Sequence, residues 1–420
     1  MNNALPQKDR DILRRLAERK MQMATDPVNL ERREAWYALD DGAAYRPMIL
    51  AEVGGIRDKA SPLATLGEPQ CSDPWARQVE QRILSLEERY NFDVLKDDHV
   101  VEPYATIPWQ ISATDFGVQK VDHHTSNGDQ MTSASWDAPI RDLDADFGKL
   151  RQRTFTVDRA KTLEEKAKLE AVFGDILPVT LGGMYHWTLG MTGSLIHLIG
   201  LEGLMLAMYD NPAGLHRIMA FMRDDALAYT KWLEEEGIYG LNNRNDYIGS
   251  GSMGYTRRLP QGDWTAGMKV RRKDLWVLLE SQETVGVGPE LFEEFIFPYQ
   301  QDIADVFGLV YYGCCEPVHN RFHILKRLKN LRRISVSPWA DQAFMAAECG
   351  TDIVFSRKPN PTLISTSVFD EAAIRRDLRE TLDIAKGCRL EIVMKDVHTL
   401  DNAPTRLPRW VQLAQEEAGR

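Results

Sequence analysis

Sulfur and oxygen ligands gather after two strand-like segments in the C-terminal third of the chain. The run YYGCCEPVH places Cys314, Cys315 and Glu316 side by side, and the run KDVH adds the imidazole of His398. Thiolates, imidazoles and carboxylates are the groups that hold zinc in proteins, so we predict a metal site built from these four residues. The spacing is not that of a zinc finger, and two buried thiols that pack as small apolar groups are an equally good interpretation.

The geometry of a strand limits this prediction. Successive residues on a strand point to opposite faces, so only one of Cys314 and Cys315 can face the site unless the strand has already ended. Which of the two faces the site stays open.

Polar residues that follow other apolar runs complete the candidates. Strands often end in polar residues simply because they leave the core, so clustering is what favours chemistry over structure. Glu283 and Asp396 could be a fourth ligand or a general acid or base, because burial raises the pKa of a carboxylic acid. The catalytic candidates are Glu283, Asp396 and Tyr312. The candidates for substrate binding are Glu52, Tyr185, His186, Trp187, Asn245, Trp339 and Asn360.

Short β-branched or aromatic runs alternate with segments of helical period along most of the chain. The predicted strands are 46–54, 92–100, 175–183, 239–246, 275–283, 308–316, 332–338, 351–357 and 388–396. This alternation indicates an α/β protein with a parallel sheet, and the number of strands favours a distorted (β/α)8 TIM barrel. Reactive groups in that fold lie at the carboxyl ends of the strands, where the candidates fall.

The domain organisation follows from the same pattern. Residues 1–40 form a predicted N-terminal helical extension, and residues 41–420 form a single barrel. Two stretches, 103–145 and 247–274, do not fit the alternation, and we interpret them as lid-like insertions or binding loops.

Composition excludes several classes of function. The chain has 420 residues and a formal net charge of −11, which disfavours nucleic acid and anionic membranes as partners. Five cysteines are too few for a disulfide framework, and the odd number leaves a thiol free. The N-terminus has no apolar signal region, and the apolar window 189–208 is interpreted as a buried helix. We therefore expect a cytoplasmic protein.

Three segments match the pattern of a known superfamily. They are WDAPIRDLDADFGKL at 136–150, LGGMYHWTLGMTGS at 181–194 and SQETVGVGPELFEEFIFPYQQDIADVFGLVYYGCCEP at 281–317. In type and order they resemble the uroporphyrinogen decarboxylase superfamily, and the resemblance covers about 40 to 400. It implies a distorted (β/α)8 barrel with its cleft at the carboxyl ends of the strands.

The resemblance favours one branch of that superfamily. The decarboxylases carry an Arg-rich loop after the first strand, whereas this chain reads LAEVGGIRDKA with Glu52, which would repel a substrate with many carboxylates. The methyltransferase branch holds zinc with a His-x-Cys motif and a later Cys. Here the Cys falls on Cys314, the His position falls on Tyr312, and the later Cys falls on 396–398. A site with fewer thiolates would make zinc a harder Lewis acid, suited to polarising an ether oxygen.

The resemblance therefore implies a methyltransferase of a corrinoid-dependent demethylation system. Such an enzyme would take a methyl group from a small methoxylated aromatic donor and pass it to the corrinoid (cobalamin) of a separate corrinoid protein, with zinc as Lewis acid. Aromatic residues at 103–110 and 247–264 would form the rim that meets this partner. A metal-free decarboxylase or lyase of a small carboxylic acid, and a non-catalytic barrel that binds a corrinoid protein or a ligand, stay open as alternatives, as does a homodimer.

Overall fold

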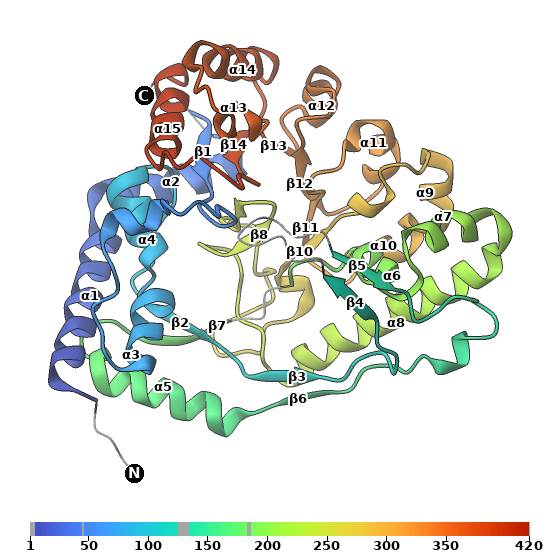
Figure 1. Cartoon of the computed structure of the whole chain (residues 1–420), viewed down its shortest axis with the longest axis horizontal. Helices are drawn as coiled ribbons and strands as arrows, with labels where there is room; N and C mark the ends of the chain where they lie inside the picture. The colour runs from blue at the N-terminus through green and yellow to red at the C-terminus, as the bar shows by residue number, and fades with distance from the viewer. Residues whose placement is uncertain (1–4, 44–45, 125–133, 183–185, 420) are drawn as a thin grey trace.

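A computed structural model describes residues 5–43, 46–124, 134–182 and 186–419 of the chain. Its central element is a six-stranded parallel sheet (Figure 1). The strand order is β1 (Met48–Ala51), β14 (Leu390–Met394), β13 (Val354–Arg357), β12 (Leu331–Val336), β11 (Leu309–Tyr312) and β10 (Trp276–Leu279). A second parallel pair joins β2 (Ala105–Pro108) to β7 (Val179–Gly182). The α/β class is confirmed, but within the described ranges no strand ladder joins the pair to the sheet, so closure into a barrel is not shown.

The two faces of this sheet are covered differently. Ile49, Ile392 and their alternate neighbours pack among helices in the largest hydrophobic cluster. The intervening residues Leu50 and Val393 lie on the opposite face, in a cluster that contains Tyr255. The hairpin of β8 (Tyr247–Gly249) and β9 (Ser252–Met253) lies against that second face, which we call the hairpin face; the first is the helix face.

Fifteen helices accompany the strands in the described part of the chain. Their bounds are α1 (Gln7–Thr25), α2 (Pro27–Asp41), α3 (Pro74–Gln78), α4 (Leu86–Tyr90), α5 (Arg159–Phe173), α6 (Thr192–Ile199), α7 (Leu201–Asp210), α8 (Pro212–Glu235), α9 (Pro289–Phe295), α10 (Phe297–Ala304), α11 (Phe322–Leu325), α12 (Gln342–Cys349), α13 (Thr362–Ser365), α14 (Glu371–Ile384) and α15 (Arg406–Glu417). The N-terminal extension is helical as predicted, and α2 begins with Asp26 capping the amide of Val28. Among the described residues, no single helix has the length and apolar character needed to cross a membrane; α6 and α7 meet that test only as a pair bent by 89°.

Two predicted strands are absent at their expected places. Residues 91–95 form a π-helical turn instead, and 239–246 contains no strand; the chain pairs only from Tyr247. In the predicted strand 92–100, aspartate side chains occupy backbone amides of β1 that a neighbouring strand would otherwise use. The carboxylates of Asp98 and Asp97 accept the backbone amides of Ile49 and Ala51, at 2.7 Å and 3.0 Å.

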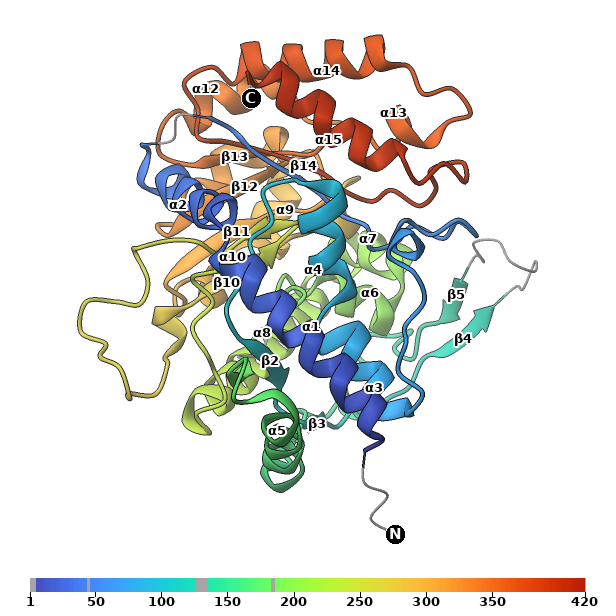
Figure 2. The ribbon, with the colours of Figure 1, turned by 90° about the vertical axis from the view of Figure 1, so that its left-hand side faces the viewer.

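The two predicted lid-like insertions differ from each other. In 103–145, β2 belongs to the parallel pair, β3 (Ile111–Ala113) pairs with β6 (Phe155–Val157), and β4 (Val121–His124) pairs with β5 (Ala134–Asp137). Figure 2 shows β4 and β5 projecting from one side of the molecule, as a lid-like element would. In 247–274, residues 248–256 are buried, so this part is an internal hairpin and not a lid.

Candidate functional site

Strand alternation directs ionisable side chains to the hairpin face at the carboxyl edge of the sheet. Glu52 follows Leu50, Lys358 follows Ser356, and Lys395 follows Val393, each two residues further along the same face. Contacts confirm these positions: Lys395 Nζ lies 3.3 Å from Ser250 Oγ of the hairpin, and Lys358 Nζ donates to Ser356 Oγ at 2.5 Å. The same period places Glu280, which follows Leu278 of β10, on this face.

The turn after β11 brings both thiols into this group. The strand ends at Tyr312, and Gly313 takes a φ of 94°, a conformation that glycine adopts without strain. Both cysteines have therefore left the strand, so the alternation that would have separated them no longer applies. Their Sγ atoms lie 3.6 Å apart. Cys315 Sγ lies 3.3 Å from Asp396 Oδ2, and Lys395 Nζ lies 3.8 Å from Cys314 Sγ.

The electrostatic setting gives these groups unusual acidities. Burial and the nearby carboxylates of Glu316 and Glu283 raise the pKa of Glu280, so it holds its proton at neutral pH. A hydrogen bond from Cys315 and the charge of Lys395 lower the pKa of the Cys314 thiol. Burial lowers the pKa of Lys358 to about 8. A neutral acid and a thiol with a lowered pKa therefore occur together at one edge of the sheet.

Burial also governs Glu52 at the end of β1. It raises the pKa of this carboxyl group, while Lys395 and Lys358 oppose the shift. The carboxylate that the sequence assigned to substrate binding thus lies among cations on the hairpin face.

Of the four predicted metal ligands, Cys314 and Cys315 lie together, and Glu316 and His398 do not join them. Glu316 is fully buried, and its two oxygens accept the backbone amides of Ser281 and Cys314, each at 2.9 Å. His398 is exposed and lies beside Gly55 in the loop after β1. Over the described ranges, no three His, Cys, Asp or Glu side chains are arranged to hold a metal ion. The residues present therefore do not fit the predicted zinc, and we derive no chemical step through it.

Two predicted catalytic residues lie away from the cluster at the strand ends. Tyr312 is fully buried on the helix face, because it alternates with Tyr311, and its hydroxyl donates to Gln300 Oε1 at 2.8 Å. Glu283 accepts a hydrogen bond of 2.6 Å from Thr192 Oγ1 at the start of α6. The structure thus gives Tyr312 a packing role and leaves Glu283 at the margin of the site.

Three predicted substrate-binding residues have local structural surroundings. Asn360 Oδ1 accepts from the backbone amide and hydroxyl of Thr362, which closes a turn. Trp339 is 63% exposed after β12. The Oδ1 of Asn245 is buried, and no hydrogen-bond partner for it is found in the structure.

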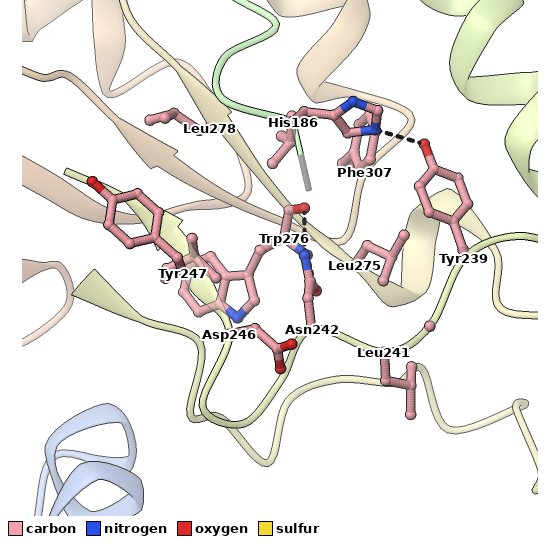
Figure 3. A pocket seen from close by; sticks show the side chains of 13 residues that line it. His186, Tyr239, Leu241, Asn242, Asp246, Tyr247, Leu275, Trp276, Leu278 and Phe307 are labelled. Atoms are coloured by element: carbon pink, nitrogen blue, oxygen red, sulfur yellow. Dashed lines mark hydrogen bonds between the residues drawn. The ribbon is translucent and has the colours of Figure 1, made fainter. Parts of the chain in front are cut away.

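An aromatic cavity lies where the predicted fourth strand is missing (Figure 3). It measures about 290 Å³, and His186 Nε2 lies 3.1 Å from the hydroxyl of Tyr239 in its wall. Its further lining residues are Gly240, Leu241, Asn242, Asp246, Tyr247, Ile248, Leu275, Trp276, Val277, Leu278 and Phe307. A second cavity of about 360 Å³ shares His186 and adds Trp187, whose ring stacks on Tyr247. Of the predicted pocket residues, Tyr185 lies outside the described residues.

The β8–β9 hairpin connects the cavity with the strand ends. Ile248 lines the cavity, and Ser250 contacts Lys395. Two glycines allow the close approach: a Cβ on Gly249 would stand 2.6 Å from the ring of Tyr311, and one on Gly251 would stand 2.5 Å from Val393. Sequence reasoning missed this arrangement and did not select Glu280, Lys358 or Lys395, although the two-residue period of each strand was a usable signal for all three.

Together, these features define an α/β protein with a candidate site at the carboxyl edge of a parallel sheet. No protein-family model matches the chain, and no curated protein matches it. Among solved structures, a methyltransferase from Methanosarcina mazei is similar at 12% identity and a TM-score of 0.49, over 92% of this chain and 98% of that one. A likeness of this size assigns no function, and membership of the uroporphyrinogen decarboxylase superfamily stays a prediction.

Proposed function

We propose that this chain is a methyltransferase that takes the methyl group of a small methoxylated aromatic donor and passes it to the corrinoid of a separate protein. The observation that carries the proposal is the cluster of Glu280, Cys314 and Lys395 at one edge of the sheet, next to an aromatic cavity. The resemblance of three sequence segments to the uroporphyrinogen decarboxylase superfamily, which has a corrinoid-dependent branch, supports the same class.

The cavity and the acid stand at a suitable separation. Leu278 lines the cavity, and Glu280 follows two residues later on the same face, about 7 Å further along the strand. Tyr239, Tyr247 and Trp276 offer aromatic surfaces to a ring bound in the cavity. A methoxy group on that ring would extend toward Glu280.

The chemical step then needs a proton donor at the ether oxygen. When a nucleophile forms a bond to the methyl carbon, the C–O bond breaks and its electron pair stays on oxygen. Glu280, kept neutral by burial and by its acidic neighbours, gives its proton to that oxygen, so the donor leaves as a neutral phenol. The nucleophile in this proposal is the reduced cobalt of the partner's corrinoid.

The test is a demethylation assay without the unidentified partner. The purified chain is incubated anaerobically with 1,2-dimethoxybenzene and free reduced cobalamin, and phenol product and methylated cobalamin are quantified. We expect the two products in equal amounts, and we expect Glu280→Gln to lower kcat by about 10²- to 10⁴-fold. The exposed Glu170→Gln serves as matched control and should behave as the parent. No product from the parent chain, or full activity in Glu280→Gln, would contradict the proposal.

The pH profile sharpens the same assay. Because the structure raises the pKa of Glu280 to about 8, the protonated acid is the main form below this pH and disappears above it. We expect kcat to fall as pH rises through about 8, and this fall to be absent in the residual activity of Glu280→Gln. Zinc content, measured on the same samples, reports whether the metal accompanies activity.

A second candidate is a metal-free decarboxylase or lyase of a small carboxylic acid. It is favoured by two lysines, Lys358 and Lys395, that face the same space on the hairpin face and could pair with a carboxylate. Release of carbon dioxide from a panel of small keto acids, without demethylation, would support this candidate instead. Binding of a methoxyarene or of cobalamin without any turnover would indicate the non-catalytic barrel.

A further inference from the structure

The neighbouring thiols of Cys314 and Cys315 form a chemical unit of their own. All five cysteines are in the thiol form, and the sulfur atoms of these two lie 3.6 Å apart, within hydrogen-bonding distance. Since a disulfide bond is about 2.05 Å long, the two sulfurs would have to approach by about 1.5 Å to form one. Neither thiol is committed to the predicted metal site, whose other ligands point elsewhere.

The two sulfurs differ in access and in surroundings. Cys315 is half-buried, so a small molecule in solution can reach the pair, whereas Cys314 is only 6% exposed. Cys314 lies beside the ammonium group of Lys395, which stabilises negative charge on its sulfur. Cys315 Sγ lies 3.3 Å from Asp396 Oδ2, and the hydrogen bond to Cys314, burial and the charge of Asp396 raise the pKa of the Cys315 thiol, so Cys314 is the first nucleophile.

We propose that Cys314 and Cys315 close into a reversible disulfide between adjacent residues when a low-molecular-weight disulfide is the oxidant. The Cys314 thiolate attacks one sulfur of the oxidant and releases the first small thiolate. Cys315 then attacks Sγ of Cys314 and expels the second small thiolate, which takes up the proton that the Cys315 thiol gives up. The two cysteines are oxidised by two electrons, and the oxidant is reduced to one small thiolate and one small thiol.

The geometry also makes this bond easy to reverse. Neighbouring Cα atoms are about 3.8 Å apart across a trans peptide, closer than the roughly 4.4–6.8 Å of ordinary disulfides. A strained disulfide has a higher reduction potential and belongs to the labile class. The pair is therefore suited to a switch that removes the thiolate beside Lys395 in oxidising conditions and restores it in reducing ones. This inference does not depend on the proposed methyl transfer.

The test uses the full chain and oxidised glutathione. After oxidation, free thiols are alkylated with iodoacetamide and the protein is digested with trypsin. One tryptic peptide, 274–321, contains Cys314 and Cys315, no other cysteine, and no internal Lys or Arg. We expect this peptide without alkylation and lighter by two hydrogen atoms than its reduced form. Dithiothreitol should restore two alkylated thiols.

Variants separate the pair from the other cysteines. Cys315→Ser should stop at a mixed disulfide of glutathione with Cys314, and the half-buried Cys388→Ser should behave as the parent. Two alkylated cysteines in peptide 274–321 after oxidation, or its cross-link to another cysteine-containing peptide, would overturn the proposal. Both outcomes are read on the unmodified parent chain, so a variant that fails to fold does not weaken the test.

Discussion

Individual residues at the candidate site owe their chemistry to the face on which they lie. Lys358 and Lys395 share the hairpin face with Glu52 because each stands an even number of residues from a buried apolar or small partner. Tyr312 directly follows Tyr311 on β11, so its side chain points to the opposite face, the helix face, and does not reach the site. Whether each of these residues reaches the candidate site thus depends on which face of the sheet its position on the strand directs it to.

How much of the site could be predicted follows from the same residues. Cys314, Cys315 and Asp396 do meet, because polar groups that follow parallel strands share the carboxyl edge of the sheet, although β12 and β13 lie between β11 and β14. Glu316 could not be judged from sequence, because its two oxygens bind backbone amides whose positions depend on the folded turn. His398 missed the cluster because Asp396 takes a φ of 57° and redirects the chain.

His186 gives a prediction on stability. Burial, with a smaller effect of Arg153, lowers its pKa from 6.5 to about 4. Between pH 6.5 and about 4, His186 is protonated in the unfolded chain but neutral in the folded chain. The contribution of this residue to the free energy of unfolding is therefore complete above about pH 7 and is lost as pH falls toward 4. We expect it to reach at most roughly 3 kcal/mol.

The measurement is urea unfolding of the parent and of His186→Gln from pH 7 to pH 4. The variant should lose less stability over this range than the parent, and the exposed His323→Gln should match the parent. Equal pH dependence in the parent and in His186→Gln would refute the assignment.

At the scale of elements, the strands of the six-stranded parallel sheet could be predicted from the sequence. Six of the predicted strands correspond to β1, β10, β11, β12, β13 and β14, because a strand buried on both faces has a continuous apolar run, and a seventh, 175–183, corresponds to β7. The predicted strand at 92–100 failed because the side chains of Asp97 and Asp98 bind the amides of Ala51 and Ile49, and the backbone adds a single bond, from Asp98 N to the carbonyl of Ile49 at 2.9 Å. The glycine-rich run 249–254 lies in a stretch interpreted as a lid-like insertion or binding loop, yet its glycines allow close packing inside the molecule.

The β8–β9 hairpin yields a prediction at this scale. Gly251 has a φ of 86°, and a Cβ there would stand 2.5 Å from Val393 Cγ1 and 3.0 Å from Glu52 Oε1. We expect Gly251→Ala to destabilise the protein by about 2–4 kcal/mol, from overpacking and left-handed backbone strain together. Gly262→Ala, where nothing lies within 4 Å, should change stability far less. Thermal unfolding of both variants checks this prediction. Similar melting temperatures would contradict it, because they would mean that the hairpin shifts to accommodate the added Cβ.

For the whole molecule, the N-terminal helices and the sheet share one buried cluster. Trp36 of α2 is fully buried with Leu50, Val393 and Tyr255, and its Nε1 donates to the carbonyl of Asp98 at 2.8 Å. The predicted boundary at residue 40 therefore divides the chain in sequence but runs through a common core. The extension is needed to cover the hairpin face.

This sharing predicts a large cost for a single change in the extension. Trp36→Ala should lower the free energy of unfolding by about 3–5 kcal/mol, because it empties a core position next to the sheet. Tyr209→Ala, at a side chain 74% exposed, should stay within about 0.5 kcal/mol of the parent. Chemical denaturation measures both, and a small effect of Trp36→Ala would mean that the extension only rests on the surface.

The internal hairpin also has a consequence for biosynthesis. Ser252 bonds to Glu391, which lies 139 residues later in the chain, and Gly251 nests against Val393 of the same strand. When the ribosome has made the hairpin, the strand that will hold it does not yet exist. In the nascent protein these glycines and their apolar neighbours cannot pack against the sheet until β14 has been translated, and contacts this distant in sequence slow the final collapse. The hairpin is therefore expected to reach its final position only after synthesis of β14.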